Sequence, residues 1–500
     1  MSEKKGILFQ ASRAATGTLL SRGSGLVRDV LFAYVFGTSF QYDAYIVAIS
    51  IPFLLRSIFA EGGLSSAFVP IYKRSKDKNA FATGVFLFLL FTAGVVSLLL
   101  AIFAPNIVYL FATGLRQNAK AFAYAVKMER FTAFFLLFIS LWAWGAGILN
   151  SHKSFFVPSL SPMFNNLFII GGILLSPLFH PHILSVAIGF SVGGAFQFLF
   201  EMPFLKKIGF KPVPLEDKSE RNEFLRAFFF TSLSVALSQT NFFVDTNIAS
   251  RLASGSISIL QYANRIYQLP MGILIVSLAS VYLPEMSEKR NVQELKASIH
   301  DAFSKLFFIM IPSTFFIALF SRQIIDVIYA HGAFNTQSAF LTSEVLLIYI
   351  MGFPFQSSII IMNRALYAFK SAKTATLVTL FGVLTNVVGD LTLGLRYSVN
   401  GMAFATTLSA MVSFTILYLI ERKKYSIRIS EVKGEFFKIL FASLLSTIPL
   451  YLSSLIKNPW FSLILGFFSF SISFMVLSHL FKSENASRMW NIFNIKRKKS

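Results

Sequence analysis

Apolar runs of roughly 20 residues recur along the whole 500-residue chain, separated by short polar stretches. Each run is long enough to cross the hydrocarbon core of a bilayer as an α-helix, whose backbone hydrogen bonds are satisfied within the segment. A single water-soluble core could not bury so many of them. We count about fourteen spans between residues 12 and 481. The pattern therefore predicts an all-α integral membrane protein with many passes.

The polar stretches alternate in charge. Stretches 73–79 and 206–221 are rich in Lys and Arg, whereas 37–44 and 176–182 contain neither. Because the excess of Lys and Arg lies in cytoplasmic loops, this alternation places both termini in the cytoplasm. We also expect no cleaved signal peptide, because the first span contains charged residues that the apolar region of a signal peptide lacks.

One stretch does not fit the alternation. Residues 114–130 lie outside in this scheme, yet they include Arg116, Lys120, Lys127 and Arg130. An amphipathic helix in the membrane interface is one interpretation, and the pattern does not decide it.

Composition narrows the function. Charged residues make up 14% of the chain, against about 25% in soluble domains. The net charge of +22 would indicate nucleic acid in a soluble protein, but the positive-inside rule explains it here. With no cysteine there is no thiol nucleophile and no Cys-based metal site. His180 and His182 flank a proline in a short loop, where a solvated turn is favoured over a metal pair.

No phosphate-binding loop, Gly-rich nucleotide motif or nucleophile elbow is found. We therefore expect neither an enzyme nor a transporter driven by ATP bound to this chain, and no cofactor.

A weak internal repeat divides the chain. The second span ends in SSAFVPIYKRS (65–75) and the eighth in ASVYLPEMSEK (279–289). An offset of six helices predicts two six-helix lobes around a central cavity, as in many secondary transporters. The predicted parts are a first lobe at 1–205, a cytoplasmic linker at 206–226, a second lobe at 227–420, and two extra helices with a basic tail at 421–500.

Charged residues inside the spans mark the candidate site. A charge at the bilayer centre costs roughly 2.5–3.5 kcal/mol, so such side chains should face a water-filled cavity or each other. Arg22 and Asp29 are two helical turns apart and share a face of the first span. The full set is Ser21, Arg22, Arg28 and Asp29 in the first span, Arg56 and Glu61 in the second, and Arg265 in the eighth.

Arginine has a planar fork that binds phosphate oxygens in pairs and stays charged when desolvated. Four cavity arginines would suit a diphosphate head group, with Asp29 and Glu61 as partners in the empty site. Interhelical salt bridges that only clamp the lobe are the alternative. The excess of positive over negative charge favours the binding site.

A second candidate site lies later in the chain. Asn386 and Asp390 are four residues apart and face the same way on a helix. Oxygen ligands suit a hard cation, so a coupling sodium ion and a protonatable carboxylate are both open. Polar packing between helices is the competing interpretation. The candidate ligands are Asp245, Asn386, Asp390 and Thr406.

The run SRGSGLVRDVLFAYVFGTSFQYDAYIVAISIPFLLRSIFAEGGLSSAFVPIY (21–72) resembles the signature of the MurJ/MviN lipid II flippases, which belong to the multidrug/oligosaccharidyl-lipid/polysaccharide exporter superfamily. Further similar segments are YANRIYQLPMGIL (262–274), YAHGAF (329–334) and ALYAFKSAKTA (365–375). Phe53, Ser57 and Asn264 depart from residues common in the family. The resemblance covers essentially the whole chain.

The resemblance implies a lipid II flippase of the bacterial inner membrane that works by alternating access. Lipid II would be its partner, with cell-wall synthesis proteins as further candidates. The family's essential arginines correspond to Arg22, Arg28, Arg56 and Arg265, and Asp29, Asp43, Glu61 and Ser21 match other family positions. The last two spans would form a groove for the lipid tail.

The nearest rival function is export of another lipid-linked oligosaccharide by the same fold. A drug exporter should have an acidic and aromatic cavity, which the arginines disfavour. A membrane acyl- or glycosyltransferase would need a catalytic His or Asp–His set near the interface, and none is found. A transport-inactive scaffold is disfavoured by the intact arginines.

Overall fold

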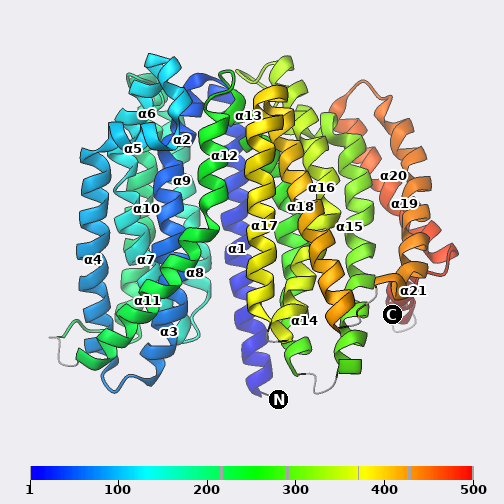
Figure 1. Cartoon of the computed structure of the whole chain (residues 1–500), viewed down its shortest axis with the longest axis horizontal. Helices are drawn as coiled ribbons and strands as arrows, with labels where there is room; N and C mark the ends of the chain where they lie inside the picture. Colours follow the sequence, from blue (N-terminus) through cyan, green and yellow to red (C-terminus); the bar gives the residue numbers. More distant parts are fainter. Residues whose placement is uncertain are drawn as a thin grey trace. The chain divides into compact units, whose positions relative to one another are not determined.

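The computed structural model describes residues 2–213, 218–288, 292–369, 371–425, 427 and 429–497, and all regular secondary structure within them is helical. Packing divides the chain into two compact units, Met1–Ser258 (unit 1) and Ile259–Ser500 (unit 2). Figure 1 shows the helices with their labels. The predicted all-α membrane fold is confirmed.

Unit 1 holds twelve α-helices and three short helical segments of other types among its described residues. They are α1 (Ser2–Phe36), α2 (Phe40–Arg56), the π-helix η1 (Ser57–Leu64), α3 (Ser65–Arg74), α4 (Lys78–Ile102), α5 (Ala104–Phe111), the 3₁₀-helix η2 (Thr113–Gln117), α6 (Ala119–Thr132), α7 (Phe135–Ser151), α8 (Phe156–Leu160), α9 (Pro162–Leu174), the 3₁₀-helix η3 (Ser176–Leu178), α10 (Leu184–Lys207), α11 (Lys218–Ser238) and α12 (Thr240–Ala249).

Small residues let the helices of unit 1 approach closely. A Cβ added to Gly189 of α10 would lie 2.5 Å from the carbonyl oxygen of Phe168, so α9 and α10 touch backbone to backbone. The core beside α7 is aromatic, with Trp144 donating its indole N–H to the Ala82 carbonyl at 2.9 Å. A buried indole without such a partner would be costly.

The helices α5 and α6 lie at the end of unit 1 opposite the amino terminus (Figure 1).

Unit 2 contains the rest of the described chain. Helix α13 (Ser256–Pro270) begins at its boundary, and it is followed by the π-helix η4 (Met271–Ile275), α14 (Val276–Glu288), α15 (Val292–Ile328), α16 (Thr336–Ala368), α17 (Ala372–Gly389), the π-helix η5 (Asp390–Gly394), α18 (Leu395–Tyr425), the 3₁₀-helix η6 (Ile429–Val432), α19 (Lys433–Ser454), α20 (Pro459–Leu480) and α21 (Glu484–Arg497).

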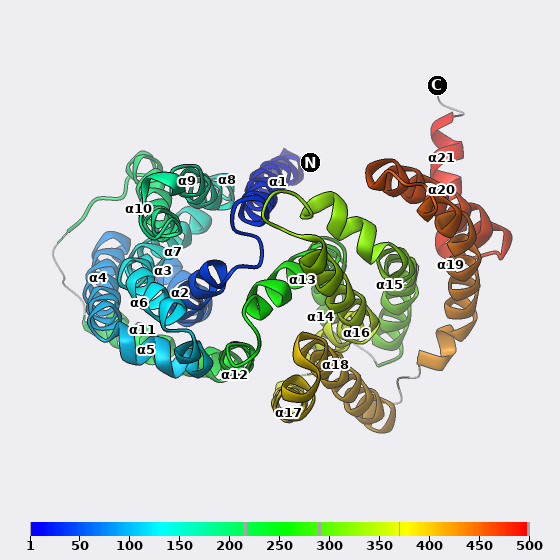
Figure 2. The same ribbon diagram turned by 90° about the horizontal axis from the view of Figure 1, so that it is seen from above.

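Within unit 2, α15, α16 and α18 pack together, and the α19–α20 hairpin lies against α15 (Figure 2). Close packing of the hairpin depends on Gly466, where an added Cβ would lie 2.6 Å from the ring of Phe320. The two predicted extra helices are thus a distinct layer on the outer side of α15.

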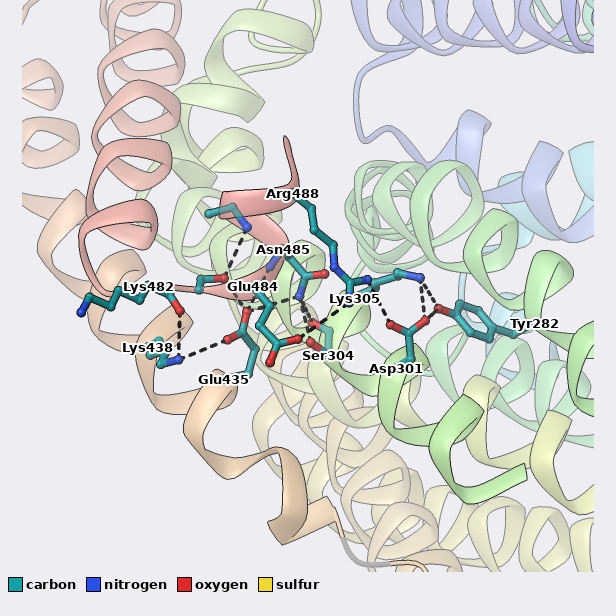
Figure 3. Close-up of polar contacts among 12 residues, drawn as sticks. Tyr282, Asp301, Ser304, Lys305, Glu435, Lys438, Lys482, Glu484, Asn485 and Arg488 are labelled. Carbon is teal, nitrogen blue, oxygen red and sulfur yellow. Dashed lines mark hydrogen bonds and ion pairs between the residues drawn. The ribbon is translucent and has the colours of Figure 1, made fainter. Parts of the chain in front are cut away.

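A polar cluster fixes this hairpin and α21 to the first turns of α15 (Figure 3). Asn485 donates to the hydroxyl of Ser304 at 2.9 Å and to the carboxylate of Glu435 at 3.3 Å. Asp301 accepts from Lys305 at 2.6 Å and from the hydroxyl of Tyr282 on α14, and it lies 3.6 Å from Arg488 of α21. Four helices therefore share one network of charge-assisted hydrogen bonds.

The predicted number of about fourteen spans is not confirmed. Among the described residues, eleven helices are long and apolar enough to cross a membrane. One of them, Lys373–Tyr425, joins two predicted spans through a kink at Tyr397 and Ser398. The charged residues of α1 lower its apolar character, and α1 is not among the eleven.

The packing units do not follow the predicted lobe boundaries. The residues that we assigned to the linker (206–226) and the first described helices of the predicted second lobe, α11 and α12, pack in unit 1. The lobe assignment from the internal repeat stays a prediction.

Residues 114–130 form η2 and most of α6, and α6 continues toward α7 in one candidate span, Ala119–Ser151. Ala121, Ala125 and Met128 are buried against the unit, whereas the four basic residues of the stretch are exposed. The stretch is therefore amphipathic, as one interpretation of the sequence held.

Candidate functional site

Helix α1 carries most of the predicted arginine site and packs on α8 and α9. A Cβ added to Gly17 would lie 3.1–3.2 Å from backbone atoms of Leu160 and Phe156, so α1 and α8 are in tight contact. Farther along, Gly25 faces the side-chain amide of Asn166 on α9. The small residues on this face bring α9 within hydrogen-bonding reach of the charged turn of α1.

Arg28 is held on both sides. Its Nε and Nη2 donate to Oδ1 of Asp29 at 2.9 and 2.7 Å, and its Nη1 donates to Oδ1 of Asn166 at 2.9 Å. The side chains of Arg28 and Asp29 are 13% and 10% exposed, so the ion pair is largely shielded from solvent. Low exposure strengthens each hydrogen bond and makes an unpaired charge expensive. The guanidinium is thus fixed in one orientation.

Asn166 is a site residue that the sequence analysis missed. Its side-chain amide donates to the Ser21 carbonyl and to the Ser24 hydroxyl, both at 3.0 Å, while its oxygen accepts from Arg28. One amide therefore links three positions of α1. Nothing in the local sequence distinguishes Asn166 from a packing asparagine, because its partners lie about 140 residues earlier in the chain.

Arg22 and Ser21 lie one to two turns before Arg28. Arg22 is exposed, and Ser21 is half-buried, with its carbonyl accepting from the hydroxyl of Ser24 at 2.8 Å. The structure therefore places an exposed arginine and a fixed arginine on the same helix. Ser21 contributes to this site through its backbone carbonyl, which accepts from Ser24 and from Asn166.

Arg56 ends α2, and the π-helix η1 follows it directly. Its guanidinium lies 5.6 Å from the ring centre of Phe53, a cation–π distance. The π-helical segment includes the EGG sequence at residues 61–63, so the helix departs from α-geometry directly after Arg56. The side chain of Glu61 lies outside the described residues.

Arg265 belongs to unit 2 and is half-buried on α13, one and a half turns before Pro270 and the π-helix η4. Because it lies in the other unit, its membership in one cavity with the three arginines of unit 1 stays a prediction.

Asp43 binds the start of α13. Its Oδ1 accepts from the backbone N–H and the hydroxyl of Ser258 at 2.8 and 2.5 Å, and its Oδ2 accepts from the N–H of Gly255 at 2.5 Å. All of these groups lie within unit 1, and Asp43 is 4% exposed. A carboxylate that satisfies the first N–H groups of a helix stabilises its N-terminus. Whether Asp43, together with Asp29 and Glu61, also supports or gates the substrate site stays a hypothesis that the family resemblance suggests.

The predicted cation ligands are divided between the units. Asp245 lies in unit 1, where Asn241 donates to it at 3.4 Å. In unit 2, the Asn386 amide donates to Asp390 at 2.8 Å, and both residues are 1% exposed. Thr406 is exposed and donates to the Met402 carbonyl at 3.2 Å.

A close helix crossing brings Asp390 and Thr406 to neighbouring positions. A Cβ added to Gly389 would lie 2.6 Å from the Cβ of Ala405, so α17 and α18 touch one residue before each predicted ligand. The carboxylate of Asp390 and the amide of Asn386 carry oxygens of the kind that a hard cation binds. In the described part of the chain, no three or more His, Asp or Glu side chains cluster in a way suited to a metal.

Three buried glutamates were not predicted. Glu129 and Glu201 in unit 1 and Glu421 in unit 2 are 0% exposed. Both carboxylate oxygens of Glu201 and of Glu421 lack a hydrogen-bond partner in the described structure. Gly145 leaves the room for Glu201, since a Cβ there would lie 2.5 Å from Oε2. The indole N–H of Trp142 donates to the hydroxyl of Ser161 at 2.6 Å.

The family model described as lipid II flippase MurJ matches residues 32–480. The probable lipid II flippase MurJ of Thermotoga maritima is 34% identical over 450 residues, which cover 88% of this chain and 90% of that protein. The lipid II flippase MurJ of Thermosipho africanus is 35% identical over 92% of this chain and 93% of its own length.

Solved structures are similar to this chain in the same way as the sequence relatives. A lipid II flippase MurJ in an inward closed conformation superposes with a TM-score of 0.83 at 33% identity, covering 94% of this chain and 98% of that one. An inward-facing multidrug resistance MATE transporter of the MOP superfamily gives a TM-score of 0.63 at 17% identity over 85% of this chain and 99% of its own, a likeness of fold alone. The chain therefore belongs to the lipid II flippase MurJ family of multi-pass membrane proteins.

Proposed function

We propose that this chain moves lipid II, the undecaprenyl-diphosphate-linked peptidoglycan precursor, from the inner to the outer leaflet of the bacterial inner membrane. The observation that carries the proposal is Arg28, a shielded arginine on a membrane helix that Asp29 and Asn166 hold in one orientation. A fixed guanidinium presents paired N–H donors to a phosphate without first ordering a flexible side chain.

The arginines would divide the binding of the diphosphate between them. Arg22, exposed on α1, makes the first contact, and Arg28 then exchanges one of its present acceptors for a phosphate oxygen. Arg56, at the junction of α2 and η1, adds a cation whose position depends on the local helix geometry. Arg265 supplies the corresponding charge from unit 2. Asp29 keeps Arg28 paired between substrates, which avoids a buried uncompensated charge.

The transport cycle is inferred to be alternating access between lobes 1–205 and 227–420, with α19 and α20 binding the lipid tail. Both termini would be cytoplasmic, as the loop charges indicate. A sodium ion at Asp390, Asn386 and Thr406, with Asp245 from unit 1, would reset the cycle, and a proton is the alternative ion. The membrane potential acts on each moved charge with about 2.3 kcal/mol per 100 mV.

Complementation tests this proposal. The full chain is expressed in a bacterium depleted of its own lipid II flippase, next to Arg22→Ala, Arg28→Ala, Arg56→Ala and Arg265→Ala. We expect growth with the wild type and loss of growth with each variant at equal membrane abundance. Arg422→Ala, at an exposed position of α18, is the matched control and should still rescue. Rescue by all arginine variants would show that the site is structural.

A substrate test separates the rival function. Accumulation of lipid II in the inner leaflet on depletion, relieved by the wild type, supports lipid II as the cargo. If the wild type instead relieves the accumulation of a different lipid-linked oligosaccharide and leaves lipid II accumulation unchanged, export of that oligosaccharide is supported.

A further inference from the structure

Five exposed cations lie on η2, on α6 and in the segment after α12, which hydrogen-bonds to η2. Helix α6 lies at the end of unit 1 opposite the amino terminus (Figure 1). We name this set the basic face. Lys120 and Lys127 are two helical turns apart on α6, with a further cation one turn beyond them, so they share one side of the helix. Its members are Arg116, Lys120, Lys127, Arg130 and Arg251.

No described carboxylate forms an ion pair with any of the five. Three acidic residues on the helices packed here have other partners. Glu129 is buried and accepts from Thr132, Asp43 is bound to Gly255 and Ser258, and Asp245 accepts from Asn241. The positive charge of the face is therefore not neutralised by the unit itself. Lys and Arg at this density are also unexpected at an end of the molecule that the loop charges place outside.

Neutral partners hold several of these cations in place. Arg116 lies 4.0 Å from the ring centre of Tyr109, and Arg251 donates to the Thr113 hydroxyl and to the Asn247 side chain at 3.1 and 3.0 Å. Lys127 donates to the His180 carbonyl at 3.2 Å. These contacts order the side chains without neutralising them, and ordered cations lose less entropy when they bind an anion.

An apolar border lies beside the basic face. Ile102, Phe103 and Leu110 on the α4–α5 corner are more than half exposed, and Phe131 and Phe134 are exposed at the end of α6. Tyr109 belongs to both parts, since its ring is partly exposed and stacks against Arg116. Cations next to exposed apolar and aromatic side chains are typical of a segment at the boundary between hydrocarbon and water.

We propose that the basic face binds the anionic head groups of phospholipids in the leaflet at this end of the molecule. The apolar border sets the depth of α5 and α6 at the hydrocarbon boundary, which brings Lys127 and Arg130 to the level of the lipid phosphates. The binding anchors the α5–α6 corner and is independent of the proposed transport function. It also accounts for the one basic stretch that the positive-inside rule does not explain.

The test is hydrogen exchange of the full chain in lipid nanodiscs of phosphatidylcholine with increasing phosphatidylglycerol. Peptides covering 113–134 should exchange more slowly as the phosphatidylglycerol fraction rises. The triple variant Lys120→Gln, Lys127→Gln and Arg130→Gln removes three exposed cations and keeps Arg116 and Arg251, whose local contacts support the fold. One surface cation contributes about fivefold to membrane binding, so the loss of three weakens binding roughly a hundredfold. The triple variant should therefore show little or no protection of peptides 113–134 at any phosphatidylglycerol fraction tested.

A matched triple variant, Lys206→Gln, Lys207→Gln and Lys211→Gln, removes the same charge from exposed positions at the other end of unit 1. It should keep the protection of 113–134. Equal exchange in both lipids, or protection that survives the α6 variant, would overturn the proposal. Protection by inorganic phosphate alone, or only by an added acidic protein, would also overturn it, because neither needs a lipid surface.

Discussion

The contact of Asp43 with the start of α13 leads to a quantitative prediction. In Asp43→Ala, the N–H groups of Gly255 and Ser258 lose their acceptor inside a buried site. An unsatisfied buried donor costs about 1–3 kcal/mol, and the loss of a negative charge at a helix N-terminus adds about 0.3–1 kcal/mol. The variant should therefore lose about 2–7 kcal/mol, a large part of the stability of a typical domain.

Two further variants separate the causes. Asp43→Asn keeps one acceptor oxygen but presents an N–H₂ group to the other donor. Its stability should therefore lie between those of the wild type and Asp43→Ala. Gly255→Ala leaves Asp43 intact but strains the same junction, since Gly255 has φ +93° and an added Cβ would lie 2.6 Å from the Thr38 carbonyl oxygen. It should destabilise the same segment by a steric route.

The assay is thermal unfolding of the purified full chain together with hydrogen exchange of peptides covering 250–262. We expect a lower midpoint and faster exchange in the order wild type, Asp43→Asn, Asp43→Ala. If Asp43→Ala matches the wild type within about 0.5 kcal/mol, the carboxylate does not hold the helix start and the reasoning fails.

Four other variants test the packing. Gly401→Ala should lower the free energy of unfolding by about 1–3 kcal/mol or more, because its Cβ would lie 2.0 Å from the Leu393 carbonyl oxygen. Its control is Gly434→Ala in α19, where an added Cβ meets nothing within 4 Å, so thermal unfolding should be unchanged or slightly stabilised. Glu201→Met should raise the unfolding temperature, because an unsatisfied buried polar group costs about 1–3 kcal/mol and the apolar side chain removes that cost. A lower unfolding temperature would reveal a partner that Glu201 needs. Asn485→Ala should loosen α21, with about 1–3 kcal/mol lost locally and faster hydrogen exchange in residues 484–490. Unchanged hydrogen exchange would mean that the polar cluster in Figure 3 does not hold the helix.

The parts of the site that follow from local sequence were predictable. Charged residues inside an apolar run identify α1 and α2 directly, because the bilayer makes each such residue expensive. The loosened helix after Arg56 follows from the glycine pair in η1. The amphipathic character of α6 follows from the spacing of Lys120 and Lys127.

The parts that depend on distant contacts were not predictable. Asn166 acquires its role only when α9 packs on α1, and Glu201 only when Gly145 leaves space on α7. The number of spans also depends on where helices are interrupted. The backbone leaves helical geometry at Tyr397 and Ser398, between two predicted spans, so Lys373–Tyr425 is not one continuous helix. Periodicity describes one helix at a time and carries no information about which neighbour a polar side chain meets.

The three π-helical segments have a mechanical consequence for the side chains around them. Each π segment holds one residue more than an α-helix would over the same length. Shifting that extra residue along the helix rotates the intervening side chains by about 100° and translates them by about 1.5 Å, with nearly all backbone hydrogen bonds kept. Arg56 directly precedes one segment, Arg265 lies shortly before another, and Asp390 begins the third. A small change of helical register can therefore turn these three charges toward or away from a partner without unfolding any span.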